Sequence, residues 1–404
     1  MQPTFLCLPA PDERTTATLR RKVTLLALRE LLTAPTAGLE PALGAAVRRL
    51  QGWLVGASQR HKGAVLAAVQ RPEVLTPLLV MRSGLRPAGD MLEAAAPELL
   101  AALAGVVAEG FLWDRPVRRV SAGARAWTFD PPADGLFVDG GGAQVRLADG
   151  TFRTLEGGAL VLPPIGDHGV ALALQDTNPL AMVEDHPDKE GNALDLGGRT
   201  AEAWCAALDE ALGLVAAGLP GWHAELGASL DRLLPVGFEP ERHLSASYRE
   251  APGVAYLTLH PSALTLAEAI VHETQHGKLN LLTWLDPVLH NGRTTWTPSP
   301  VRPDLRPLMG VLLAVHAFVP VAALHAGLAA AGHPIAAGPD FARRRREVLG
   351  SNAQGLAVLR DLAEPSALGA RLLSGLEALH AALCAAAGED ALVTVAVEGG
   401  PVVG

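Results

Sequence analysis

The chain contains little cysteine: only Cys7, Cys205 and Cys384 occur among its 404 residues. These three residues lie far apart, so the sequence has neither the paired cysteines of a zinc site nor the framework of a disulfide-rich protein. The beginning of the chain also lacks a charged segment followed by an apolar one, because prolines and a charged run interrupt it. We therefore expect no secretion signal and a cytoplasmic protein.

A basic excess is absent as well, since 33 Lys and Arg residues stand against 42 Asp and Glu residues, for a net charge of -9. Surfaces that bind nucleic acid are typically basic, so we expect no nucleic-acid partner. The glycines at 140–142 are not followed by the Lys and Ser or Thr of a phosphate loop, and we interpret them as a turn. One long uncharged run, at residues 307–334, favours a buried helix over a membrane span.

The patterns that are present divide the chain into four regions. Residues 1–114 repeat apolar positions every three or four residues, which predicts a helical scaffold or a docking surface for a peptide. Within residues 115–174, short segments of alternating apolar and polar residues are separated by turn residues, as is typical of a small β region. Residues 175–345 form the expected catalytic core, and residues 346–404 form a C-terminal helical region with a short last strand. We predict an α+β fold that is mainly helical, with small antiparallel sheets packed by a metal-binding helix.

The most informative segment is His-Glu-Thr-Gln-His at residues 272–276. It lies in an apolar stretch with helical spacing, directly after a strand-like segment at residues 253–259. Residues four apart share one face of a helix, so His272 and His276 can both reach one metal ion. Glu273 points to the side, where it can contact a metal-bound water, as in zinc proteases. Two surface histidines on an ordinary helix are the simpler alternative, and the apolar surroundings argue against it.

A catalytic metal site needs a third protein ligand and an open position. We favour His316, because Pro320 lacks an N–H and distorts the helix at the residue four positions earlier. His325 is half a turn out of phase with His316, so the two histidines cannot both face one metal. A buried histidine that only fills the core is the alternative for His316. The other candidates after the motif are Asp286, His290, Asp304 and His333.

Two arginines, Arg302 and Arg306, flank Pro303 and lie just before the uncharged run. Guanidinium groups bind carboxylates through paired hydrogen bonds, so both are natural anchors for a carboxylate co-substrate. A pair of surface arginines is the alternative. We expect residues 303–307 to open the next helix, with Asp304 as its cap.

Together these segments resemble the peptide-modification proteins with a His-Glu-x-x-His motif that belong to bacterial clusters for ribosomally made, post-translationally modified peptides. The resemblance covers residues 170–340 and extends well beyond the five-residue motif. The further segments that carry it are residues 178–179, 186–192, 195–198 and 300–307, with His316 behind them.

This resemblance implies a peptide β-hydroxylase that depends on Fe(II), 2-oxoglutarate and O₂, despite a motif typical of proteases. It implies His272, His276 and His316 as iron ligands, and Arg302 or Arg306 as the anchor of the far carboxylate of 2-oxoglutarate. Spacing alone does not choose the metal, since two imidazoles four residues apart suit Zn and Fe equally.

We therefore expect hydroxylation, at a β-carbon, of a residue in a ribosomally made precursor peptide. The leading alternative is a zinc metallopeptidase with Glu273 as general base. A third is a peptide-binding module that keeps a metal site without catalysis. The carboxylate of the more familiar iron sites, which use two histidines and one acid, would here be Glu273, Asp304 or absent.

Overall fold

The computed structural model describes residues 7–8, 14–183, 191–298 and 305–388. Within these residues the chain has an α+β fold that is mainly helical with small sheets, as predicted. Its contacts divide it into two compact units. Unit 1 consists of Met1–Thr16, Ala207–Leu226 and His260–Gly404, and unit 2 consists of Ala17–Ala206 and Gly227–Leu259. The catalytic core expected at residues 175–345 is therefore divided between the two units.

The N-terminal part of the chain is helical, as its apolar spacing predicted. Its helices are α1 (Thr15–Thr33), α2 (Pro41–Arg60), α3 (Lys62–Gln70), α4 (Pro72–Arg82) and α5 (Ala88–Leu103). Pro41 and Pro72 occupy the first turns of α2 and α4, where a missing backbone N–H costs nothing. The Glu40 carboxylate caps α2 by accepting the N–H groups of Ala42 and Leu43.

The β region that follows consists of short antiparallel strands, and the glycine run at 140–142 lies at a turn, as predicted. One sheet has the order β1-β4-β5-β6 and another the order β2-β3-β7. The strands of these sheets are β1 (Phe111–Trp113), β2 (Val117–Ala122), β3 (Arg125–Ala133), β4 (Gly135–Asp139), β5 (Gly142–Arg146), β6 (Phe152–Thr154) and β7 (Ala159–Leu160).

A third sheet of unit 2 has the order β11-β12-β10-β9-β8 and is mixed rather than antiparallel throughout. Its parallel strands are β9 (Val170–Leu172), β10 (Leu230–Phe238) and β12 (Gly253–Leu259), and β8 (Pro164–Ile165) and β11 (Ser245–Ala246) are antiparallel edges. All seven residues of β12 are buried, which explains its continuous apolar run. The pairing of β11 with β12 confirms the strand pair predicted there, although β11 is shorter than expected.

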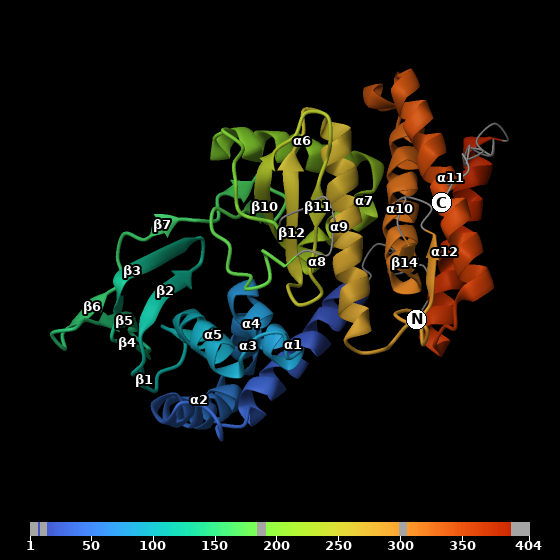
Figure 1. Cartoon of the computed structure of the whole chain (residues 1–404). Helices are drawn as coiled ribbons and strands as arrows, with labels where there is room; N and C mark the ends of the chain where they lie inside the picture. The colour runs from blue at the N-terminus through green and yellow to red at the C-terminus, as the bar shows by residue number, and fades with distance from the viewer. Residues whose placement is uncertain (1–6, 9–13, 184–190, 299–304, 389–404) are drawn as a thin grey trace, which may run out of the picture. The chain divides into compact units, whose positions relative to one another are not determined.

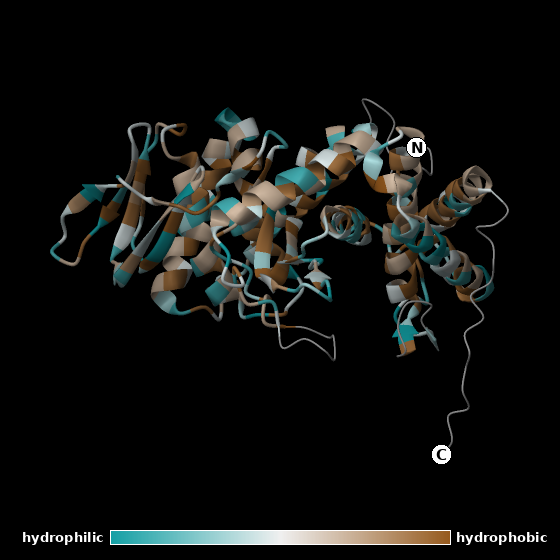
Figure 2. Cartoon of the chain, turned by 90° about the horizontal axis from the view of Figure 1, so that it is seen from above, coloured by the Kyte–Doolittle hydropathy of each residue, from teal (hydrophilic) through white to brown (hydrophobic). Residues whose placement is uncertain are grey.

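Unit 1 contains the motif helix and the C-terminal helices, of which α10, α11 and α12 lie side by side (Figure 1). Its elements include α7 (Pro220–Ala224), α9 (Ala263–Thr283), β13 (Trp296–Pro298), β14 (Leu305–Pro307), α10 (Leu308–Ala330), α11 (Pro339–Leu362) and α12 (Ala367–Ala387). Helices α6 (Ala201–Gly218) and α8 (Leu226–Ser229) contain residues of both units. Figure 2 shows apolar and polar residues side by side along many helices, as amphipathic packing requires.

The start of α10 differs from the prediction. Residues 305–307 do not open a helix but pair with residues 296–298 as a two-stranded hairpin, β13–β14. The extended Pro307 is then the N-cap, so Asp304 is not the cap of α10. Asp304 itself lies outside the described residues, as does the last strand expected near residue 395.

The long uncharged run forms α10, and 78% of its most apolar window is buried, as the buried-helix interpretation predicted. By length and composition, α10 and α12 could each cross a membrane, and the bent pair α3–α4 would be a third such segment among the described residues. In α12 only 28% of the corresponding window is buried.

Candidate metal centre

The His-Glu-x-x-His motif lies in the middle of α9, a 21-residue helix. Ser262 caps this helix by accepting the Thr265 N–H at 3.3 Å. The side chains of His272, Glu273 and His276 offer ligand atoms that all lie within 4.8 Å of one another. The structure thus brings together the three residues that helical spacing selected.

Aromatic packing fixes the orientation of His272. Its ring lies 4.3 Å from the ring of His276 and 4.6 Å from that of Phe318, measured between centroids. Both contacts are edge-to-face, the arrangement that ring quadrupoles favour. Phe318 belongs to α10, so this helix provides one apolar wall of the centre.

The electrostatic surroundings favour a neutral imidazole at His276. Burial lowers the pKa of His276, Glu273 opposes this effect, and the positive charge of Arg306 adds to it. Neutral imidazole is the form that binds a metal, so the donor set fits a divalent ion. Arg306 is half-buried on β14, opposite the buried Thr297 of β13, and its charge acts on the centre. The other predicted anchor, Arg302, lies outside the described residues.

His316 lies near the centre but is not part of the three-residue group. It is fully buried on α10, and neither ring nitrogen has a hydrogen-bond partner among the residues that the structure describes. Burial, with smaller contributions from His276 and Lys278, lowers its pKa to about 3. The side chain is therefore a neutral donor close to His276, and its role as third ligand remains a prediction.

Helix α10 packs antiparallel along α9, in a register that polar contacts define. Glu268 Oε1 lies 2.8 Å from His325 Nε2, and about two turns further along α9 the Gln275 Nε2 amide donates to the His316 carbonyl at 3.5 Å. Both Nε and Nη2 of Arg344, on α11, also donate to Glu268, at 2.9 and 2.7 Å. His325 therefore belongs to a buried ionic network, which explains its burial and agrees with the prediction that it faces away from the metal ligands.

The remaining candidates for the third ligand have other roles. Asp286 accepts hydrogen bonds from the Val288 N–H at 2.7 Å and the Ser366 hydroxyl at 2.6 Å, and so joins the loop after α9 to the start of α12. His290 is exposed, and His333 accepts the N–H of a residue in the short 3₁₀ helix after α10. None of these three belongs to the metal-ligand group of the described chain.

Sequence reasoning missed a polar network on another side of α9. Lys278 is fully buried, pairs with Glu225 and lies 4.9 Å over the ring of Trp222. The Trp222 indole N–H donates to Gln275 Oε1 at 2.9 Å, and the Thr16 hydroxyl donates to Glu225 at 3.0 Å. Lys278 itself was the one signal in the sequence, since a charged side chain on a buried helix needs a partner of opposite charge.

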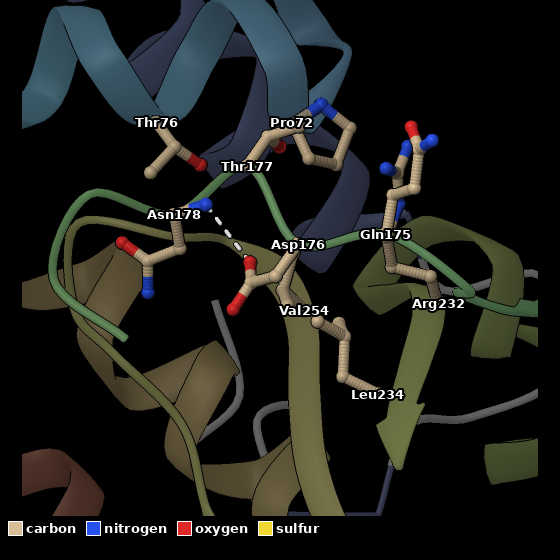
Figure 3. Close-up of a pocket in the computed structure, with 9 residues that line it drawn as sticks. All are labelled: Pro72, Thr76, Gln175, Asp176, Thr177, Asn178, Arg232, Leu234 and Val254. Atoms are coloured by element: carbon tan, nitrogen blue, oxygen red, sulfur yellow. Dashed lines mark hydrogen bonds between the residues drawn. The ribbon is translucent and has the colours of Figure 1, made fainter. Parts of the chain in front are cut away.

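A second polar site lies in unit 2, in a pocket with about 210 Å³ of empty space including its opening (Figure 3). Asp176 and Asn178 come from the loop after β9, Thr76 from α4 and Arg232 from β10. Asp176 accepts the Asn178 N–H at 2.8 Å and the Tyr256 hydroxyl at 3.0 Å. Burial raises the pKa of Asp176 despite these bonds.

The guanidinium group of Arg232, which lines this pocket, is paired with a buried carboxylate of the same unit. Arg232 donates to Glu73 at 2.9 Å, and both side chains are buried. Burial alone would raise the pKa of Glu73, but the Arg232 guanidinium outweighs it and lowers the pKa to about 2. The space that it encloses for a water-sized molecule is about 10 Å³, far below the roughly 300 Å³ at which small-molecule sites usually begin.

The remaining segments of the resemblance also lie in unit 2. Residues 195–198 form a turn in which Gly197 has a φ of +61° and packs against β10. A Cβ there would meet the backbone nitrogen of Phe238 at 2.3 Å, so the glycine is required by packing. Asn178 lines the pocket described above, and residues 186–190 lie outside the described residues.

In comparisons with known proteins, no family model and no curated protein sequence matches the chain. The function of this centre must therefore be argued from its own residues.

Proposed function

We propose that this chain is a cytoplasmic metal-dependent enzyme whose metal is held by His272 and His276. Ligand atoms about 2 Å from one ion lie within about 4 Å of each other, so a 4.8 Å group needs only small side-chain adjustments to close on a metal. The centre is walled by Phe318 and placed on a rigid helix of 21 residues. These features support a resident ion over two surface histidines.

The reaction we propose is Fe(II)- and 2-oxoglutarate-dependent hydroxylation, at a β-carbon, of a residue in a ribosomally made peptide. One observation carries this choice: the positive charge of Arg306 on β14 contributes to lowering the pKa of the proposed metal ligand His276. An arginine at that position can anchor the far carboxylate of 2-oxoglutarate through paired hydrogen bonds. A peptidase has no general need for such an anchor.

Each residue then has a stated task. His272 and His276 hold the metal, with His316 as the proposed third ligand, while Arg306 binds and orients the co-substrate carboxylate. Phe318 excludes water from one side of His272. When bound, ferrous iron with 2-oxoglutarate and O₂ supplies the oxidising chemistry, and the protein positions the C–H bond of the peptide.

A zinc metallopeptidase is the second candidate, and one observation favours it. Glu273 is only 3% exposed and lies within the same group as both imidazoles. A carboxylate in that place can take a proton from a metal-bound water, as a peptidase requires. In the hydroxylase, the same side chain would serve as an acidic ligand or balance the charge of the metal.

The two candidates differ in their products. The protein would be loaded with Fe(II) and incubated in air with 2-oxoglutarate and a precursor peptide encoded beside its gene. We expect succinate and a peptide whose mass rises by one oxygen atom. Cleavage of the peptide by the zinc-loaded protein, with no succinate from the iron-loaded protein, would contradict the hydroxylase and support the peptidase.

A further inference from the structure

Helix α10 contains a proline in its interior, Pro320, four residues after His316. Proline has no N–H, so it cannot give the His316 carbonyl the usual hydrogen bond of an α-helix. This carbonyl is instead approached by the Nε2 amide of Gln275, at a long 3.5 Å. The proline thus opens an acceptor on α10 toward the helix that carries the metal ligands.

The amide of Gln275 is oriented from its other end. The Trp222 indole N–H donates to Gln275 Oε1 at 2.9 Å, and an indole nitrogen can only donate. The Gln275 oxygen must therefore face Trp222, which turns the NH₂ group toward the His316 carbonyl. Gln275 is 0% exposed, so water does not compete for these bonds.

The position of this contact ties it to the metal centre. Gln275 directly precedes His276, and the residue that it contacts, His316, lies two positions before Phe318, which packs on His272. A slip of α10 along α9 would therefore move the Phe318 wall and the buried His316 ring together. The only other contact of this kind described above, Glu268 with His325, lies at the far end of the pair of helices.

We propose that Gln275 is a positioning residue: it uses the carbonyl opened by Pro320 to hold α10 in register beside the metal ligands. The inference rests on the proposed function only in assuming that His272 and His276 bind a metal. It makes a prediction that ordinary packing does not make, namely that the importance of Gln275 depends on the proline.

The test is a pair of substitutions measured singly and together. Gln275→Met keeps the length of the side chain but removes the amide, and Pro320→Ala restores the N–H that satisfies the His316 carbonyl within α10. The probe is Co(II), followed by its visible absorption spectrum, with the thermal midpoint of the metal-free protein measured in parallel. Because groups that orient metal ligands typically change metal affinity by about 10–100-fold, we expect Gln275→Met to weaken Co(II) binding by at least about tenfold.

In the Pro320→Ala background, the same Gln275→Met change should weaken Co(II) binding by less than about threefold, because the carbonyl no longer needs the amide. Gln51→Met is the matched control: Gln51 also donates to helix carbonyls, of Leu31 at 2.9 Å, but in unit 2. It should leave the Co(II) affinity and spectrum unchanged in both backgrounds.

A second variant tests the same role in case Gln275→Met does not fold. Trp222→Phe removes the donor that fixes the amide, and we expect it to shift the Co(II) spectrum with Pro320 present and much less with Pro320→Ala. Equal losses of affinity in both backgrounds would overturn the positioning role while leaving the proposed function intact. No Co(II) binding by the wild-type protein would overturn both.

Discussion

The proposed metal centre of unit 1 and the polar pocket of unit 2 differ in how the chain assembles them. The three clustered metal-site residues lie within five consecutive positions of α9. The pocket instead draws on α4, a loop, β10 and β12, and its Arg232 pairs with Glu73, 159 positions away in the sequence. The spacing of residues on a helix is enough to predict the first arrangement. The second can be predicted only when the topology of the sheet is known.

The two regions also differ in how their charges are balanced. Beside the pocket, the buried Glu73 neutralises Arg232, which is what burial of ions requires. In the proposed metal centre, burial lowers the pKa of His276 and His316 and so favours neutral imidazoles, and neither ring nitrogen of His316 is hydrogen-bonded within the described chain. Paired charges indicate a structural role, whereas a buried imidazole such as His316, without a hydrogen-bond partner in the described chain, is what the proposed third metal ligand requires.

The largest expected effect is a difference in activity between variants of two histidines of α10, His316 and His325. His316→Ala should abolish hydroxylation, because it removes the proposed third ligand. His325→Ala should retain metal binding and activity but lower the thermal midpoint, since it removes a buried partner of Glu268. Succinate formation and thermal unfolding are measured for both variants. The reverse order of activities would show that the wrong histidine was chosen.

The next effect tests the anchor for the co-substrate. Removing a guanidinium that holds a buried carboxylate costs on the order of 2–5 kcal/mol. Arg306→Ala should therefore raise the 2-oxoglutarate concentration needed for half-maximal succinate formation by about 30-fold or more, with iron binding nearly intact. Arg302→Ala is measured alongside it, because the sequence allows either anchor. Exposed Arg293 provides the control, and an equal effect of Arg293→Ala would remove the argument for a specific anchor.

A smaller effect concerns the ion pair of unit 2. The folded-state pKa of Glu73 is lowered from 4.5 to about 2, so its contribution to stability is present above pH 4.5 and is lost as the pH falls toward 2. Over this pH range we expect the free energy of unfolding to fall by about 3 kcal/mol because of Glu73. This decrease should be missing in Glu73→Gln. Urea unfolding of both proteins across this range measures the difference. Parallel pH profiles would show that the pair does not stabilise the unit.

The smallest effect concerns the cysteines. Burial raises the pKa of the Cys7 thiol to about 12, and its side chain is 0% exposed. At about pH 8 it should resist alkylation by iodoacetamide in the native protein, while the partly exposed Cys205 and Cys384 react first. Mass spectrometry of the labelled protein gives the order, and unfolding in urea should make all three react. Early labelling of Cys7 would contradict the packing around it.

Much of the fold was predictable because its signals are local. The motif helix was expected at residues 266–282 and runs over Ala263–Thr283, and the strand at residues 253–259 has the expected bounds. Strand β10 was not predicted, since Pro235 interrupts it and its buried run lacks alternation. The hairpin β13–β14 was mistaken for a helix start, because a proline before an apolar run suits both.

The limits of prediction at the metal centre have a similar cause. His272, Glu273 and His276 follow from periodicity, and Pro320 pointed to His316 as a special position. The contact of that carbonyl with Gln275 depends on how two helices pack and has no signal in the spacing of residues.

The motif helix α9 is proposed to bind a metal, and the metal content of the protein tests this most directly. Wild-type protein, His272→Ala and His276→Ala would be loaded with Fe(II) without oxygen, dialysed against a mild chelator and analysed for bound metal. His290→Ala, which removes an exposed histidine outside the group, is the control. We predict one equivalent of metal in the wild-type and control proteins and loss of most of it in both motif variants. Full metal content in both motif variants would place the site elsewhere and contradict the account.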